Sequence, residues 1–597
     1  MKISRSILKN CFAFVFAIAL CASVPNRLDA SITAQITPSQ VSRALLGTVV
    51  TWTVVASDTQ PGVLWYRFRA RPMGGNFHAM KDYSPSNTME WTETDSEGLY
   101  VVEASIRNFD TGETVFASAT YEMDSRLVNN QPVISPTNHP LVFLYSAPPC
   151  PVGREIQVYF WSMQGDVQTT PSTPCRQGLS RNFYLAGLHP QETYRVQHWI
   201  TGHGRQTEGP ILSLTAGAVP NSVAGRPLVS QSVLQTSPVP ERDDILLEGP
   251  IAGTPVATDL NGNVIWYYPG NLTFLTRPEP NGLFFGIQNS GTDPSGSFLR
   301  EFDLTGRTVL ETNAAAVNQQ LVALGKRTVG VFHHEARRLP DGNIATLATV
   351  ERILNDVQGP GPVDVIGDMV VVLNSNLRVV WTWDAFDHLD VTRAAVLGET
   401  CTGSGSCMSH FLAPDGNDWT HGNALQETSD GNFLFSSRHQ DWLIKIDYQN
   451  GFGDGHVLWR MGQDGDFVIE SDDSYPWFSH QHDANFLNDN ATLTLFDNGN
   501  TRKSADPTAN SRGQALIVDE NRRVVLLELN KDLGVFSAAV GSAQKLPNGN
   551  YHFDAGWVNN NSAISFEVDR LGNTIRAIQA GAPEYRTFRM RDLYTPN

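Results

Sequence analysis

From about residue 243 to the C-terminus, one short pattern recurs: an acidic residue or Asn, a turn, then β-branched residues that often end in Trp or Leu. The copies span residues 259–266, 303–310, 374–381, 447–459, 519–526 and 569–576. Each copy predicts a β-hairpin, and six hairpins in one region predict a six-bladed β-propeller. A β-helix or a large sandwich is the alternative, although the coils of a β-helix would be shorter and more even.

The rest of the chain also favours strands. A chain of 597 residues is too long for one core, and its 49 Gly, 34 Pro and 10% aromatic residues suit an all-β protein with many turns. We predict an Ig-like β-sandwich at residues 31–126 and a fibronectin III-like β-sandwich at 127–225. Residues 188–196 resemble the fibronectin III corner, where a Tyr packs on the sandwich edge. A linker at about 220–241 precedes the propeller at 243–597.

The N-terminus and the net charge bear on location and partners. Residues 1–30 have a charged start, a short apolar core and a cleavage site typical of a secretory signal, so we expect a periplasmic or secreted protein. A membrane anchor is the alternative, but the apolar run is too short to span comfortably, and we expect no stable membrane insertion. The net charge of −18 and the lack of a basic stripe argue against nucleic-acid binding.

Four cysteines remain after the predicted signal. They form two local pairs, Cys150 with Cys175 and Cys401 with Cys407. An exported compartment oxidises such pairs, so we predict two disulfides. A zinc site is the alternative, but the C-x₂-C spacing of zinc sites is missing.

Three histidines occupy the same phase of the repeat. His334, His421 and His482 each precede a turn signal and an apolar strand pattern. If each begins the innermost strand of a blade, the end of its hairpin partner returns to the same mouth of the channel. The residues predicted to share that mouth are His334 with Arg352, His421 with Arg438 and His439, and His482 with Asn498.

The predicted mouth combines imidazoles with guanidinium groups and few carboxylates. Arginine grips tetrahedral oxyanions through a rigid fork of donors, and histidine serves as nucleophile or general acid and base near neutral pH. These residue types suit an anionic group with several oxygens, such as sulfate or phosphate. Any one of these histidines alone would more often be structural.

These residues resemble the bacterial arylsulfate sulfotransferase family over about 243–597. The matching stretches hold His333-His334, Arg352, Asp418-Trp419-Thr420-His421-Gly422-Asn423 and Gln481-His482-Asp483, and a short disulfide loop, here Cys401–Cys407, precedes the Asp-Trp-x-His motif. The resemblance implies an exported six-bladed propeller that moves a sulfuryl group from an aryl sulfate to a phenol without a nucleotide donor. It implies that His421 becomes transiently sulfated, and that His334 and Arg352 bind the sulfuryl oxygens or assist proton transfer.

We therefore expect an arylsulfotransferase with no cofactor, whose partners are an aryl sulfate donor and a phenolic acceptor. The predicted catalytic residues are His421, His334 and Arg352, and the predicted substrate-binding residues are His482, His439, Arg438, Asn423 and Asn498. A homodimer and a disulfide-forming oxidase that acts during maturation are further candidate partners.

The chain departs from the family at one point. The first blade, with residues 246–254, lacks the family's further active-site His, so either another group such as His439 or His482 replaces it or the acceptor chemistry differs. Two other functions stay open: a non-catalytic exported propeller that binds glycans or proteins, and a metal-dependent propeller hydrolase. Glu335 and Asp483 adjoin two of the histidines, but neighbouring strand residues point to opposite faces, which disfavours a metal site.

Overall fold

The structure is a computed structural model of the chain. It describes residues 31–163, 167–224, 228–231, 245–290, 293–402, 410–487, 489–559 and 561–596. The predicted signal at 1–30 lies outside these residues, as does Cys407. The helices of the described residues are short: α1 (Asn221–Ala224), α2 (Ala314–Ala323), α3 (Ala385–His388), α4 (Asn500–Ala505), η1 (Pro294–Gly296), η2 (Arg438–Gln440) and η3 (Gln449–Gly451). The protein is all-β, as predicted, and none of these helices is long and apolar enough to cross a membrane.

The N-terminal unit consists of two sheets around one core. One sheet has the order β1-β3-β6, and strands β2-β8-β7-β4-β5 lie opposite it. Trp52, Trp91 and Tyr121 are buried between the two sheets and contact one another edge to face. The strands are β1 (Ile32–Pro38), β2 (Ala44–Leu45), β3 (Val50–Asp58), β4 (Leu64–Pro72), β5 (His78–Ser84), β6 (Thr88–Trp91), β7 (Gly98–Asn108) and β8 (Thr114–Asp124).

The second unit also has two sheets. Its strands are β9 (Val133–Pro136), β10 (Phe143–Ala147), β11 (Glu155–Ser162), β12 (Val167–Thr169), β13 (Thr173–Pro174), β14 (Arg181–Leu185), β15 (Thr193–Gly202), β16 (Arg205–Glu208) and β17 (Leu212–Thr215). The predicted Cys150–Cys175 disulfide is present and joins two cysteines that lie 25 residues apart in the sequence. Tyr194 is buried, and its hydroxyl accepts a hydrogen bond from the His189 backbone N–H at 2.9 Å, the contact expected of the corner.

Six antiparallel sheets of four main strands follow. The first three contain β45 (Glu584–Asp592), β19 (Ile245–Pro250), β20 (Val256–Asp259) and β21 (Val264–Tyr267); then β22 (Phe274–Glu279), β23 (Leu283–Asn289), β24 (Ser297–Asp303) and β25 (Thr308–Asn313); then β26 (Phe332–Arg338), β27 (Ile344–Asn355), β28 (Pro362–Leu373) and β29 (Val379–Asp384). The last three contain β32 (Gly422–Glu427), β33 (Phe433–Ser437), β34 (Trp442–Ile446) and β35 (Val457–Gly462); then β37 (His482–Phe486), β38 (Thr492–Asp497), β39 (Arg512–Asp519) and β40 (Val524–Asp532); then β41 (Ser542–Lys545), β42 (Tyr551–Val558), β43 (Ser562–Val568) and β44 (Thr574–Ala580). Every predicted repeat turn joins the third strand of a sheet to its fourth.

Shorter strands extend these sheets at their edges. They are β46 (Thr595–Pro596), β30 (Thr400–Thr402), β31 (Asp415–Asp418), β36 (Val468–Glu470) and β18 (Leu228–Gln231). Strand β18 lies within the stretch predicted as a linker and pairs with β44, so the last sheet recruits residues ahead of position 243.

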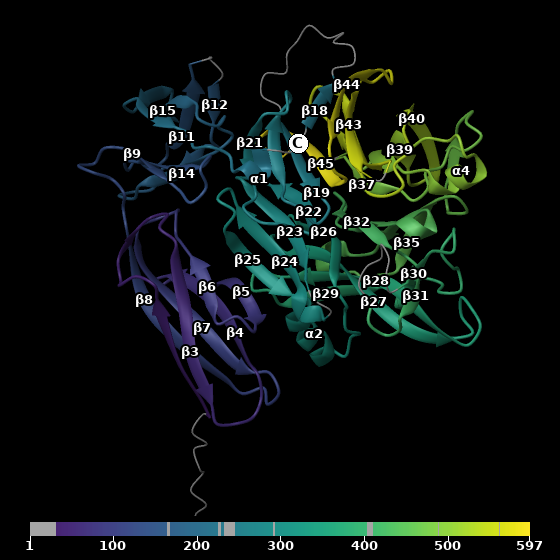
Figure 1. The fold of residues 1–597 in the computed structure, drawn as a ribbon, viewed down its shortest axis with the longest axis horizontal. Coiled ribbons are helices and arrows are strands. Elements are labelled where there is room, and N and C mark those ends of the chain that lie inside the picture. Colours follow the sequence, from purple (N-terminus) through teal and green to yellow (C-terminus); the bar gives the residue numbers. More distant parts are fainter. Residues whose placement is uncertain are drawn as a thin grey trace, which may run out of the picture.

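The first strands of the six sheets contact one another in a closed cycle. The order around the cycle is β22, β26, β32, β37, β41 and β45, and β45 contacts β22 again. The first sheet combines the two ends of this region, because β45 pairs with β19 and places Met590 opposite Ile245. Figure 1 shows yellow β45 beside teal β19. The apolar cores lie between neighbouring sheets.

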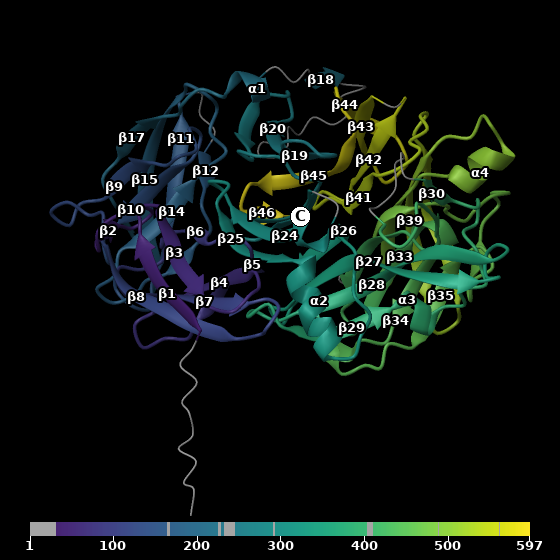
Figure 2. The same cartoon turned by 60° about the horizontal axis from the view of Figure 1, so that its bottom comes forward.

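The N-terminal units lie against one side of these sheets in both views (Figures 1 and 2). Strand β5 pairs with β25, so the first unit continues the second sheet, and Thr312 donates a hydrogen bond to Asp82 at 3.0 Å. The second unit is joined to the C-terminus by Tyr594, whose hydroxyl accepts from the Ala186 N–H and donates to the Tyr184 carbonyl, each at 2.8 Å.

Candidate active site

The three histidines of the repeat lie together at the start of the inner strands. His334 is in β26, His421 directly precedes β32, and His482 begins β37. The rings of His334 and His421 are 5.0 Å apart between centroids, and Phe274 stacks on the other side of His334 at 4.9 Å. Tyr585 of β45 packs edge-on to His334 at 5.6 Å. The repeat phase therefore predicted the convergence of these imidazoles.

Irregular backbone places the histidines. The pairing of β26 with β27 shifts between His333 and Ala336, and that of β37 with β38 shifts between His482 and Asn485. His334 and His421 have φ values of 53° and 46°, in the left-handed region that non-glycine residues avoid. Such strained residues cluster at functional sites, where the surrounding structure has to hold them in place.

His421 has one ring nitrogen occupied and one available. Its Nδ1 lies 2.6 Å from Oδ2 of Asp418. A carboxylate only accepts, so Nδ1 carries the proton and Nε2 keeps a lone pair. The side chain of His421 is 12% exposed, whereas that of Asp418 is 5% exposed. The arrangement presents a nucleophilic nitrogen beside a buried negative charge.

His439, in η2, has both ring nitrogens occupied. Its Nδ1 donates to the Asp418 carbonyl oxygen at 2.6 Å, and its Nε2 accepts from the guanidinium of Arg438. Burial, followed by His421 and Arg438, lowers the pKa of His439 well below its usual range. His439 is therefore held neutral beside His421, at 4.4 Å between ring centroids, and has no free nitrogen with which to carry a proton.

His482 keeps an open nitrogen. Asn498 donates through Nδ2 to the carbonyls of Ser537 and Val540, at 2.9 and 3.0 Å, so its Oδ1 must accept from Nδ1 of His482 at 2.7 Å. Burial and Arg438 lower the pKa of His482 well below its usual range. His482 is thus neutral, with the lone pair on Nε2.

Asn423 lies in the bulge of β32 and connects neighbouring sheets. Its Nδ2 donates to the Gln481 carbonyl at 2.7 Å, and its own carbonyl accepts from Arg586 at 2.7 Å. The side-chain Oδ1 is buried without a hydrogen-bond partner among the described residues. Only this oxygen is available to a ligand.

Arg352 differs from the prediction. Phe332 at the start of β26 pairs with Ala348, so β27 continues past the end of its partner before it reaches Arg352. The guanidinium lies 5.4 Å from the Phe386 ring centroid, and no hydrogen bond or ion pair among the described residues connects it to the three histidines. Hairpin geometry predicted the correct end of the hairpin but not the extra length of β27.

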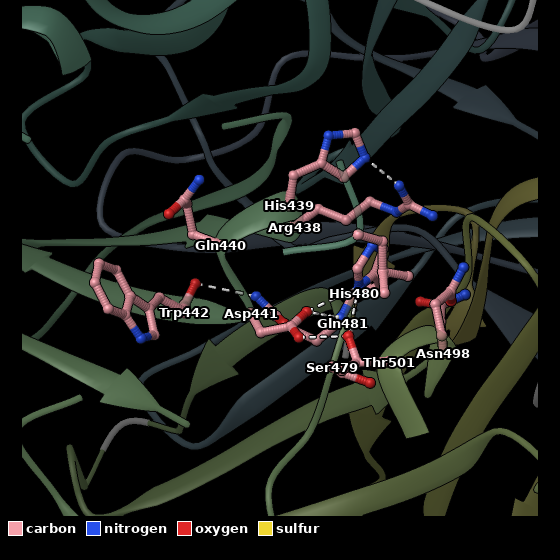
Figure 3. A network of polar contacts seen from close by, with 12 residues as sticks. Arg438, His439, Gln440, Asp441, Trp442, Ser479, His480, Gln481, Asn498 and Thr501 are labelled. Atoms are coloured by element: carbon pink, nitrogen blue, oxygen red, sulfur yellow. Dashed lines mark hydrogen bonds and ion pairs between the residues drawn. The ribbon is translucent and has the colours of Figure 1, made fainter. Parts of the chain in front are cut away.

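Carboxylates are more frequent around the histidines than expected. His480, which sequence analysis missed, is fully buried; its Nδ1 lies 2.8 Å from Asp441, and its Nε2 is hydrogen-bonded to Glu399. Thr501 donates to the other oxygen of Asp441 at 2.6 Å. Figure 3 shows Asp441, His480 and Thr501 near Arg438 and His439. Its position two residues before His482 was the one sequence signal for His480.

Two of these groups have the ligand types of a metal site. The ligand atoms of Asp418, His421 and His439 lie within 4.8 Å of one another, as do those of Glu399, His439 and His480. However, His439 donates from Nδ1 and accepts the Arg438 cation at Nε2, so it offers no lone pair to a metal. Both groups share His439, and neither fits a divalent ion well in this arrangement.

Glu335 and Asp483 are committed to a separate buried network. Arg277 binds both carboxylates, and Arg586 donates to Glu335 at 3.0 Å. All four residues lie on inner strands, and the side chains of Glu335, Asp483 and Arg586 are fully buried. These carboxylates therefore neutralise guanidinium groups and are not free to bind a metal.

Comparison with known families identifies the region that carries these residues. The profile described as arylsulfotransferase (ASST) matches residues 228–586, more than half of the chain. The chain belongs to the arylsulfotransferase family. The match starts at β18 and ends inside β45, so it covers almost all of the six sheets and every histidine of this site.

The solved structures that match this arylsulfotransferase resemble it only weakly. The chicken interferon gamma receptor alpha chain is 6% identical, with a TM-score of 0.13, over 32% of this chain and 97% of that chain. A marsupial T cell receptor is 11% identical, with a TM-score of 0.15, over 32% and 99%. The FN1–FN3 domains of chicken CNTN1 are 8% identical, with a TM-score of 0.14, over 59% and 96%. Such low scores support no functional conclusion, and no curated protein sequence matches.

Proposed function

We propose that this arylsulfotransferase is an exported enzyme that moves a sulfuryl group from an aryl sulfate to a phenol by a ping-pong route through sulfated His421. The observation that carries the proposal is the free Nε2 of His421, fixed by the Asp418 bond at Nδ1 and flanked by His334. The covalent scheme suits this geometry, because one nucleophile serves both half-reactions.

In the first half-reaction, Nε2 of His421 forms a bond to sulfur while the bond from sulfur to the aryl oxygen breaks. The phenolate leaves and takes up a proton from a neighbouring imidazole. The sulfated ring keeps its Nδ1 proton, and the Asp418 carboxylate stabilises the positive charge that develops there. In the second half-reaction an acceptor phenol gives up its proton and attacks sulfur, which frees His421.

Anion binding falls to His334 and to guanidinium groups. Negative charge gathers on the sulfuryl oxygens in the transition state, and donors aimed at it are worth most in a dry site. Arg352 is proposed to reach the donor from the outer end of β27. Arg438 lies closer to the imidazoles and makes no ion pair within 4 Å among the described residues, which supports a direct role for it.

The fold and location belong to the same proposal. The closed cycle of inner strands and the position of the repeat turns support a six-bladed β-propeller. Residues 1–30 are proposed to be a cleaved signal that directs the chain to the periplasm or to secretion, where an oxidase would close the Cys401–Cys407 pair. The proposal also includes a homodimer, which a measurement of the oligomeric state in solution would test.

The test uses 4-nitrophenyl sulfate as donor and phenol as acceptor. Wild-type protein should release nitrophenol, form phenyl sulfate, and gain the mass of one sulfuryl group on the peptide that contains His421. His421→Asn should abolish the adduct and turnover, because no other nitrogen replaces the nucleophile. Near wild-type transfer by His421→Asn would overturn the covalent scheme.

A metal-dependent hydrolase is the alternative to exclude: Asp418, His421 and His439 have the ligand types of a metal site, although both nitrogens of His439 are occupied in this arrangement. Treatment with a chelator distinguishes the two functions. Transfer between phenols that survives chelation supports the transferase, whereas activity that disappears and returns with added Zn²⁺ supports the hydrolase.

A further inference from the structure

Asp368 is a buried carboxylate that the proposed chemistry does not use. It lies in β28, is 2% exposed, accepts hydrogen bonds from two groups and forms an ion pair with a third. Its Oδ2 accepts from the Thr420 hydroxyl and, at 2.7 Å, from the Gly422 N–H. Nε2 of His333 lies 2.9 Å from its Oδ1. A buried carboxylate with three such partners is held in its ionised form.

Two of these partners enclose the nucleophile. Thr420 and Gly422 are the residues on either side of His421, and one oxygen of Asp368 binds both. His421 has a φ of 46°, so its backbone needs outside support to stay in this conformation. Asp368 gives that support from the neighbouring sheet.

The third partner leads to His334. Nε2 of His333 lies 2.9 Å from Oδ1 of Asp368, an ion-pair distance at which the carboxylate favours a proton on Nε2, and this tautomer leaves the lone pair on Nδ1 of His333. The lone pair accepts from Nδ1 of His334 at 3.0 Å. His334 therefore keeps its own Nε2 free, and a proton gained there is stabilised by the Asp368 charge through His333.

We propose that Asp368 and His333 are positioning residues: Asp368 holds the backbone of His421, and the Asp368–His333 pair makes His334 the imidazole that gives the leaving phenolate its proton. This inference rests on the proposed function and assigns its proton carrier. His439 has no free nitrogen, although its Nδ1 lies 3.7 Å from the Asp418 carboxylate, and His482 is backed only by the neutral amide of Asn498.

The proton balance is simple. In the free enzyme His334 is neutral, because burial and then the nearby His421, His333, His482 and Arg586 lower its pKa well below the usual range. Binding of the donor anion offsets those neighbours, and His334 takes a proton from solvent at Nε2. That proton passes to the phenolate as the bond to sulfur breaks, and the acceptor phenol returns a proton to the same nitrogen.

The test compares donors whose leaving groups differ in basicity. Phenyl sulfate needs a proton on its leaving oxygen, whereas 4-nitrophenyl sulfate hardly does. His333→Leu should lower kcat/KM for phenyl sulfate by about 10²-fold and for 4-nitrophenyl sulfate by less than about 10-fold. His333→Gln should restore most of the loss, because its amide can donate to Asp368 and accept from His334.

Thr420→Val is the matched control, because it removes one bond that holds His421 and leaves the His333 pair intact. It should lower kcat/KM for both donors by the same factor. Asp368→Asn is a second variant for the relay, since its amide nitrogen would donate to His333 and reverse both imidazole tautomers. It should also reduce phenyl sulfate transfer more than 4-nitrophenyl sulfate transfer.

The inference is overturned if His333→Leu lowers kcat/KM for both donors by the same factor. If His333→Leu is unfolded, Asp368→Asn takes its place in this comparison. Thermal unfolding of each variant identifies loss of fold. If wild-type protein forms no adduct on His421, the proposed function is refuted. If wild-type protein forms the adduct but His333→Leu keeps the wild-type dependence on the leaving group, only the role of the Asp368–His333 pair is refuted.

Discussion

Among the residues that the structure describes, no carboxylate lies within ion-pair distance of the buried Arg438 guanidinium, and Glu399, Asp418 and Asp441 act on it only from farther away. Its guanidinium donates to His439 and to the Ala538 carbonyl at 3.0 Å, and burial lowers its pKa. An unpaired buried charge costs several kcal/mol, and proteins keep such costs mainly where function needs them. An anionic sulfuryl group bound nearby would neutralise this charge.

We predict that Arg438→Met separates activity from stability. The variant loses two hydrogen bonds but also an unpaired buried charge, so the unfolding free energy should change by less than about 2 kcal/mol. Transfer should fall by about 10²-fold. Thermal melts and initial rates measure both quantities.

Arg307→Met is the control for that variant. Arg307 forms an ion pair with Asp303 at 3.0 Å in the turn after β24, far along the chain from the histidines. Its loss should lower stability and leave the rate unchanged. Full activity in Arg438→Met would show that Arg438 is only structural.

Single residues show where sequence analysis reaches its limit. His334, His421 and His482 were predictable because a repeat places them at equal phase. Asp368 and Arg586 were not, because the donors Thr420 and Gly422 and the partners of Arg586 come from other sheets and no local pattern marks them. Arg352 was placed at the correct hairpin end, but the length of β27 depends on its pairing with β28.

At the scale of elements, local turn chemistry made the hairpins predictable. In the turn after β20, for example, Asp259 accepts from the N–H groups of Asn261 and Asn263, a bracing that depends only on nearby residues. Strands that pair across hundreds of residues, such as β45 with β19, carry no such signal. Strand β18 also lacks a local signal, because it lies in a stretch whose composition is typical of a linker and pairs with the distant β44.

Tyr594, which directly precedes β46, makes a testable attachment to the second unit. Tyr594→Phe leaves the buried Ala186 N–H and the partly buried Tyr184 carbonyl without their hydroxyl partner. We expect a loss of about 1–3 kcal/mol in unfolding free energy, read from chemical denaturation, with sulfuryl transfer unchanged.

Tyr475→Phe is the control variant, because Tyr475 is 50% exposed. It should leave stability within about 0.5 kcal/mol of wild type. Equal stability of the two variants would mean that the C-terminal attachment contributes nothing to the fold.

At the scale of the whole molecule, buried neutral histidines set the response to acid. Burial, with Arg589 next, lowers the pKa of His552 to about 3, and burial lowers that of His139 to about 4. Both folded-state values lie below 6.5, so the unfolded chain binds more protons below that pH. Stability is therefore full above about pH 6.5 and falls as the pH drops toward these values.

His552→Gln measures this effect. At pH 5, His552 alone should cost the wild type about 2 kcal/mol relative to pH 7.5, and the variant should lack that share. Melting curves at the two pH values give the difference for each protein. Parallel losses in both proteins would contradict the assignment.

The pairing of β45 with β19 also sets an order of events. Strand β19 begins at Ile245 and its partner β45 ends at Asp592, so the cycle of inner strands cannot close until β45 has been made. His334, His421 and His482 lie between these two strands. A nascent chain that stops before β45 thus holds all three histidines but lacks the closed cycle around them, and the synthesis of β45 is the step that completes it.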